Sequence, residues 1–122
     1  MTNRRIAIAA TFDTAAIVLF VAIGRRSHDE GNTVGGIVRV AAPFLIGLAA
    51  GWLVARAWKA PTSTTTGMVI WPVTVAVGMV LRRFVFDDGT ALSFIIVATL
   101  FIGALLIGWR ALYRHQDRVF RP

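Results

Sequence analysis

The sequence contains no cysteine, only six acidic residues and two histidines among its 122 residues. Without cysteine there are no disulfides, no thiolate metal sites and no cysteine catalysis. HExxH, GxSxG and phosphate-binding glycine loops are also absent, and both histidines lie outside the apolar runs. The sequence therefore predicts no metal, no cofactor and no enzyme, with lipid-directed catalysis the one enzymatic alternative left open.

Apolar residues are abundant instead. They make up 57% of the chain, and the mean hydropathy is +0.70, whereas apolar residues are about half of a typical soluble domain. They fall into four runs, at residues 6–24, 37–55, 67–86 and 91–110. Each run is long enough, or nearly so, to cross a bilayer, and the loops between them are short. We therefore predict an all-α membrane protein, one domain of four transmembrane helices in a single bundle.

The net charge of +7 is spread over the ends of these runs, which favours an explanation by membrane topology over nucleic-acid binding. Eight Lys and Arg residues flank one side of the predicted bundle and five flank the other. The positive-inside rule then places both termini in the cytoplasm and the protein in the inner (plasma) membrane, with dual insertion as a minor alternative. The margin comes from the tail, where arginines at a spacing of three to four residues predict a stripe facing anionic lipid: Arg110, Arg114, Arg118 and Arg121.

Asp13 is the strongest candidate for a functional group. It lies inside the first run, about 10 Å from its start at a rise of 1.5 Å per residue. A charged acid at a helix centre costs about 2.5 to 3.5 kcal/mol on insertion scales, so something must compensate it. One hypothesis is a proton- or ion-binding group on a transport path. The other is a satisfied acid, bonded to nearby threonines or paired with Arg56 or Arg110.

Two further features are candidate sites. Arg82 and Arg83 form a candidate anion or lipid head-group site, with an interfacial anchor as the alternative. Gly47 and Gly51 form a GxxxG helix-packing face. A third cluster, His28 with Asp29 and Glu30, is more typical of a solvated loop than of a metal site.

An internal repeat is indicated when the chain is aligned with itself at an offset of 57 residues. Ten of the 47 aligned positions from 11 to 57 are identical without a gap. They include Arg25-Arg26 with Arg82-Arg83 and Gly51-Trp52 with Gly108-Trp109. Two parallel copies of a two-helix hairpin would give this pattern. Asp13 falls opposite Ile70, so the second copy lacks the acid.

The chain resembles a prokaryotic family of four-helix membrane proteins known only as a domain of unknown function. The residues that carry the resemblance are Asp13, Phe20, Gly24, Arg25, His28, Pro43, Phe44, Trp52, Gly67, Trp71, Arg82, Gly89, Ser93, Phe94, Gly108, Trp109 and Arg110. In layout the chain is also similar to the small multidrug-resistance exporters, in which the acid of the first helix is a glutamate shared by proton and drug. Here the acid is an aspartate and the remaining pattern does not match, so that likeness is one of layout only.

From these features we expect proton-linked transport or permeation of a small solute or ion centred on Asp13, in a homodimer or larger oligomer. Dimerisation is inferred from the close-packing face at Gly47 and Gly51 and from the small interior of four helices; the alternative is that this face packs within the bundle. The alternative is a non-transporting accessory or structural membrane protein that binds a partner protein or lipid.

Overall fold

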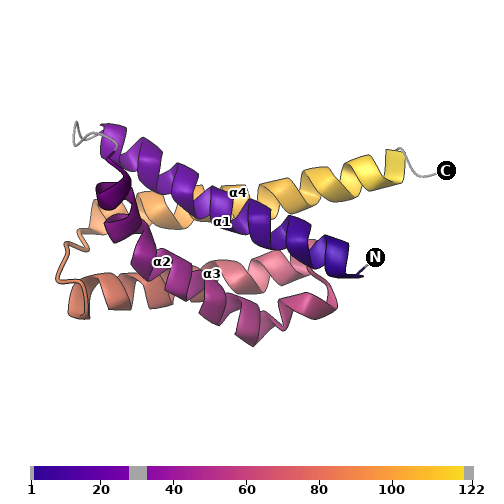
Figure 1. The fold of residues 1–122 in the computed structure, drawn as a ribbon, viewed down its shortest axis with the longest axis horizontal. Helices are drawn as coiled ribbons and strands as arrows, with labels where there is room; N and C mark the ends of the chain where they lie inside the picture. Colours follow the sequence, from indigo (N-terminus) through magenta and orange to yellow (C-terminus); the bar gives the residue numbers. More distant parts are fainter. Residues whose placement is uncertain (1, 28–32, 120–122) are drawn as a thin grey trace.

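The computed structural model describes residues 2–27 and 33–119, and these residues form four long helices (Figure 1). They are α1 (Thr2–Ser27), α2 (Val34–Ala55), α3 (Thr64–Phe84) and α4 (Leu92–Val119), with a short 3-10 helix, η1 (Ala57–Lys59), between α2 and α3. All four are long and apolar enough to cross a membrane. The predicted all-α class is confirmed, and the chain is a multi-pass integral membrane protein.

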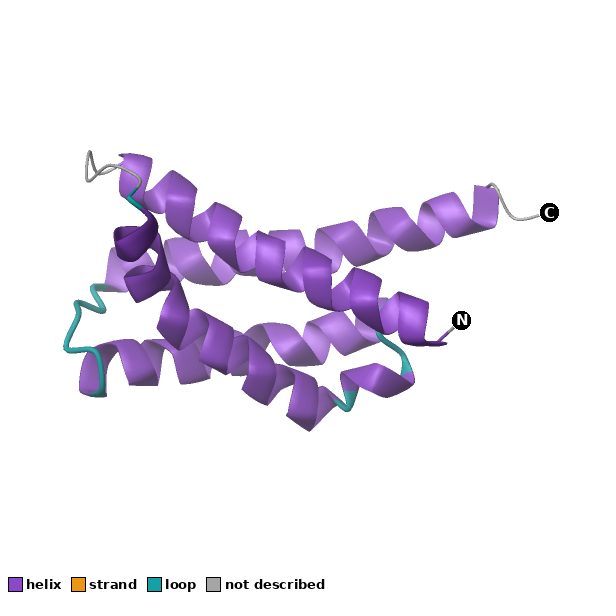
Figure 2. Ribbon diagram, in the orientation of Figure 1, coloured by secondary structure: helices purple, strands orange, loops and turns teal. Residues whose placement is uncertain are grey.

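The helices run alternately up and down, so the bundle has two distinct ends (Figure 2). We call the end where α1 begins and α4 finishes the termini end; the connection from α2 through η1 to α3 also lies there (Figure 1). The opposite end, where α1 and α3 finish and α2 and α4 begin, is the loop end.

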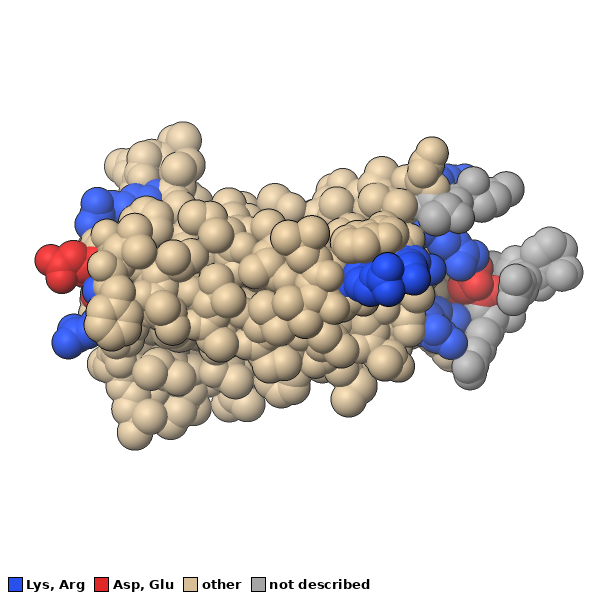
Figure 3. All heavy atoms as spheres, turned by 90° about the horizontal axis from the view of Figure 1, so that it is seen from below, with Lys and Arg blue, Asp and Glu red and all other residues tan. Residues whose placement is uncertain are grey.

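Charged side chains gather toward the two ends, and an uncharged surface lies between them (Figure 3). Large apolar side chains are exposed on the flank of every helix, among them Leu19, Ile46, Val80 and Leu100. A water-soluble protein would bury most of this area, whereas lipid tails solvate it. The flanks of the bundle therefore contact the bilayer.

Helices α3 and α4 have other bounds than the apolar runs predicted, and the earlier start of α3 makes it long enough to cross the bilayer. α3 begins at Thr64 and ends at Phe84, so its 21 residues rise about 32 Å, enough to cross the hydrocarbon core. It continues through Arg82 and Arg83 but stops two residues before the expected end at Phe86. α4 extends to Val119, well past the expected end at residue 110.

Gly47 and Gly51 of α2 lie against α3 within the same chain. A Cβ built on Gly47 would lie 2.5 Å from the carbonyl oxygen of Thr74, and one on Gly51 would lie 3.0 Å from that of Ile70. In return, the ring of Phe44 packs onto Gly78 of α3. Since α3 covers the GxxxG face, this face is not open to a second copy of the chain.

Four phenylalanines from three helices fill the interior nearer the loop end. Phe20 of α1 lies 6.0 Å from Phe44 of α2, 6.2 Å from Phe94 and 5.6 Å from Phe101 of α4, between ring centroids. These distances are typical of favourable aromatic pairs. We call this group the phenylalanine cluster; it separates the two sites described below.

We expect Gly47→Ala to destabilise the protein by about 1 to 3 kcal/mol, the usual cost of overpacking, because the added methyl meets the α3 backbone. Gly108→Ala is the matched control, since a Cβ there would meet nothing within 4 Å. Its helix propensity gain of up to about 1 kcal/mol leaves it as stable as wild type or more so. The free energy of unfolding in detergent checks both variants, and equal values would contradict the close α2–α3 contact.

Candidate functional site

The carboxylate of Asp13 faces the guanidinium of Arg110 in a two-pronged ion pair. Arg110 Nη1 donates to Asp13 Oδ1 and Nη2 donates to Oδ2, both at 2.8 Å. Both side chains have no exposed surface at all. The pair joins the middle of α1 to the C-terminal half of α4. Two-pronged pairing of this kind is the strongest that arginine and carboxylate form.

Two tryptophans complete the surroundings of the acid. The indole of Trp52 donates to Asp13 Oδ2 at 2.9 Å, and that of Trp109 donates to Oδ1 at 2.8 Å. A carboxylate has about four acceptor positions, and these four donors use them. Arg110 also donates from Nε to the carbonyl of Pro61 at 3.0 Å and from Nη1 to that of Leu106 at 3.1 Å. The carboxylate is therefore saturated, and the pair is closed off from the surface of the molecule.

Small and flat residues make room for this arginine. Gly67, in the first turn of α3, has no side chain where a Cβ would lie 2.9 Å from Arg110 Cδ. The guanidinium carbon lies 4.5 Å from the ring centre of Trp109, whose ring stacks on Phe12 at 5.0 Å. We call Asp13, Trp52, Trp109 and Arg110 the Asp13 cluster, and it connects α1, α2, α4 and the loop before α3.

Of the two hypotheses left open for Asp13, this geometry matches the satisfied acid, and its partner is Arg110, not Arg56. The indole donors were not expected, because the sequence analysis named Trp52 and Trp109 only in the internal alignment and in the family resemblance. The signal that pointed to them is the internal alignment, which matches Trp52 with Trp109.

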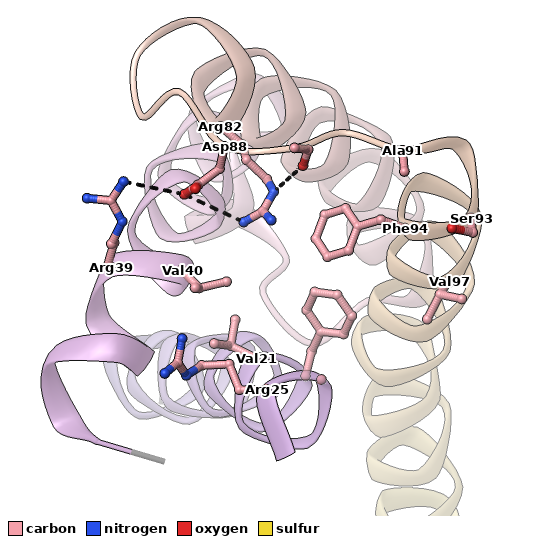
Figure 4. Close-up of a pocket in the computed structure, with 13 residues that line it drawn as sticks. Val21, Arg25, Arg39, Val40, Arg82, Asp88, Ala91, Ser93, Phe94 and Val97 are labelled. Atoms are coloured by element: carbon pink, nitrogen blue, oxygen red, sulfur yellow. Dashed lines mark hydrogen bonds and ion pairs between the residues drawn. The ribbon is translucent and has the colours of Figure 1, made fainter. Parts of the chain in front are cut away.

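A pocket of about 590 Å³ lies at the loop end, where Phe20 and Phe94 of the phenylalanine cluster form part of its wall (Figure 4). Its walls are apolar on one side and basic on the other. The lining residues are Phe20, Val21, Gly24, Arg25, Arg39, Val40, Arg82, Asp88, Gly89, Ala91, Ser93, Phe94 and Val97. The three arginines come from α1, α2 and α3, and Arg25 lies across the pocket from Arg82 (Figure 4).

Arg82 is held in a fixed orientation. Its Nε donates to the carbonyl of Gly89 at 2.7 Å, and its guanidinium carbon lies 4.4 Å from the ring centre of Phe94. Asp88 Oδ2 lies between two arginines, 4.0 Å from Arg82 Nη1 and 3.8 Å from Arg39 Nη2. Within the part of the chain that the structure describes, the buried Nη1 of Arg82 has no hydrogen-bond acceptor.

Arg82 and Arg83, proposed together from the sequence as an anion or lipid head-group site, lie in different surroundings. Arg82 lines the pocket, whereas Arg83 is exposed and is not among its lining residues. Arg25 and Arg39 join the site although the sequence did not single them out, and the alignment of Arg25 with Arg82 was the available signal. The cluster of His28, Asp29 and Glu30 and the last tail arginine, Arg121, lie outside the described residues.

We expect Asp13→Leu and Arg110→Met each to destabilise the protein by about 3 to 5 kcal/mol, because each leaves a buried charge without its partner. The double variant replaces both charges by apolar groups and recovers most of that loss. Arg114→Met is the control, since Arg114 is exposed one turn further along α4. Unfolding free energies in detergent measure the coupling, and simple additivity of the two losses would contradict a direct pair.

The chain was compared with protein families, curated proteins and solved structures, and a family model matches it. The search of curated proteins and of solved structures found no match to the chain. A family model described as a protein of unknown function, DUF3054, matches residues 10–113, a span that contains the whole Asp13 cluster and every residue that lines the pocket. The sequence-based resemblance to a domain of unknown function is thereby confirmed, and the chain belongs to the DUF3054 family.

Proposed function

We propose that this protein binds an anionic ligand in its loop-end pocket, and that the Asp13 cluster holds the bundle together without itself carrying ions or protons. Of the two functions considered from sequence, this is the accessory, lipid-binding alternative. It involves binding without catalysis.

The observation that carries the proposal is the unsatisfied Nη1 of Arg82. A buried polar group without a partner is uncommon in folded proteins, and a charged one costs more than a neutral one. Among the described residues, Arg39 and Arg82 share the single carboxylate of Asp88, which leaves this group with a net charge of +1. An anion from outside the chain would supply the missing acceptor and balance this charge.

The apolar wall sets the second property of the ligand. Phe20 and Phe94 present aromatic rings, and Val21 and Val97 present aliphatic groups, to the same space as the arginines. A pocket of about 590 Å³ falls in the range of 300 to 1,000 Å³ typical of organic ligands. The combination favours an amphiphile, a molecule with an anionic head and an apolar body.

Transport centred on Asp13 is less well supported than binding. The four acceptor positions of the carboxylate are used by protein donors, which leaves none for a passing cation. Phe20 follows Asp13 by seven residues, about 10 Å along α1, and the phenylalanine cluster lies between the acid and the pocket. An acid on a permeation path needs contact with water or solute, and Asp13 has no exposed surface.

The orientation of the termini, the contact of the tail with lipid and the assembly of the chain extend the proposal. The count of eight cationic residues against five favours termini in the cytoplasm and location in the inner membrane. The exposed Arg114, on the part of α4 beyond the bundle, suits contact with anionic lipid. A homodimer, if formed, must use a face other than Gly47 and Gly51.

We expect Arg82→Gln to weaken binding of phosphatidic acid by tenfold or more, because a hydrogen bond to a charged group contributes about 1.5 to 3 kcal/mol. Arg83→Gln is the matched control: it removes the same charge one residue away, outside the pocket, and we expect a change of less than about twofold. Native mass spectrometry from phosphatidylcholine mixed micelles measures both affinities. Equal losses in the two variants would mean that the lipid responds only to surface charge, and absence of binding to the wild type would refute the proposal.

A second measurement separates binding from transport. Vesicles that contain the wild-type protein and a pH-sensitive dye should collapse an imposed pH gradient no faster than empty vesicles. Proton flux that disappears in Asp13→Asn would restore the transport hypothesis.

A further inference from the structure

Among the residues that the structure describes, Asp88 is the acidic residue that lines the pocket, and it sits between two of the arginines (Figure 4). Its Oδ2 approaches Arg39 and Arg82 at 3.8 and 4.0 Å, within ion-pair distance but beyond hydrogen-bond distance. The side chain is 29% exposed and lies on the loop between α3 and α4. The contact is therefore long, partly hydrated and easily exchanged for a better one.

We propose that the pocket selects the doubly charged phosphomonoester head group of a lipid, and that Asp88 is the internal counter-ion that this head group displaces. The inference rests on the proposed function and specifies its ligand.

Charge counting favours a phosphomonoester over a phosphodiester. An anion with a single charge would replace the carboxylate of Asp88 one for one and leave the balance of the arginines unchanged. A phosphomonoester carries about −1.5 to −2 at pH 7 and offers three acceptor oxygens. It would pair with Arg39 and Arg82 together and supply the acceptor that Arg82 Nη1 lacks.

Two elements beside the arginines support the same ligand chemistry. Arg82 is already oriented by Gly89 and by the ring of Phe94, so little side-chain freedom is lost when a ligand binds. The first turn of α4 borders the pocket through Ser93, and the N-terminal end of a helix favours negative charge.

The apolar walls point to a lipid as the source of the phosphate. Phe94 and Val21 point into the space that Arg82 and Asp88 border, and Val97 also lines the pocket (Figure 4). Free phosphate would leave these walls without a partner, whereas an acyl chain or glycerol backbone would cover them. The pocket also lies at the end of the membrane-crossing helices, the level at which lipid head groups lie.

The test compares two lipids with identical acyl chains in phosphatidylcholine nanodiscs: phosphatidic acid, a phosphomonoester, and phosphatidylglycerol, a phosphodiester. We expect the wild type to prefer phosphatidic acid by about tenfold, the effect of one additional charge-assisted contact. Inorganic phosphate at millimolar concentration should not compete. Effective competition would identify free anion as the ligand and overturn the lipid assignment.

Asp88→Asn should strengthen binding of phosphatidylglycerol several-fold and reduce the preference, because the diester no longer has to displace a carboxylate. Asp87→Asn is the matched control: it removes the same charge next in sequence, at a position outside the pocket lining. Its φ of 55° is one that asparagine tolerates well, so the loop keeps its shape. We expect an unchanged preference in this control.

The outcomes separate the two proposals. Equal wild-type affinity for both lipids, or the same change in Asp88→Asn and Asp87→Asn, would overturn the selection by Asp88 while the pocket remained a binding site. Absence of binding to either lipid, or equal losses in Arg82→Gln and Arg83→Gln, would overturn the proposed function itself. Thermal unfolding of each variant verifies that the bundle is intact.

Discussion

The ion pair between Asp13 and Arg110 is the constraint on which the rest of the bundle depends. Two charges with no exposed surface are stable inside a membrane only when every donor and acceptor is matched. Here the match requires an indole from α2, another from α4, a carbonyl from the loop before α3 and a glycine that leaves space. Each helix is thereby fixed relative to the others at the termini end, where apolar packing against lipid would not specify a unique arrangement.

At the loop end the requirements are different. Arg82 is oriented there by Gly89 and Phe94, but its nearest carboxylate, that of Asp88, is 4.0 Å away and its Nη1 has no hydrogen-bond acceptor among the described residues. The phenylalanine cluster lies between the two ends, and the buried pair beyond it has no exposed surface. One end is closed around a paired carboxylate and the other has an arginine nitrogen without an acceptor, and on this difference we propose structural stability for the first and binding for the second.

Sequence reasoning reached the four helices and the membrane location, because hydropathy and charge placement are local properties. It did not reach the indole donors or the grouping of Arg25, Arg39 and Arg82, which depend on how helices pack and rotate. It identified Gly47 and Gly51 as a helix-packing face but left open whether a helix of the same chain or of a second copy covers it; α3 of the same chain does. Two pairs of residues matched by the internal alignment come together in the structure. Trp52 and Trp109 both donate to Asp13, and Arg25 and Arg82 both line the pocket.

The central claim is that Asp13 lies in a dry and saturated cluster, and hydrogen–deuterium exchange at the indole N–H groups tests it most directly. Trp71 donates to a backbone carbonyl at 2.7 Å and serves as the benchmark for a protected indole, whereas Trp58 is exposed. By NMR in detergent, Trp52 and Trp109 should exchange as slowly as Trp71. Exchange as fast as that of Trp58 would show that water reaches the carboxylate and would contradict the account.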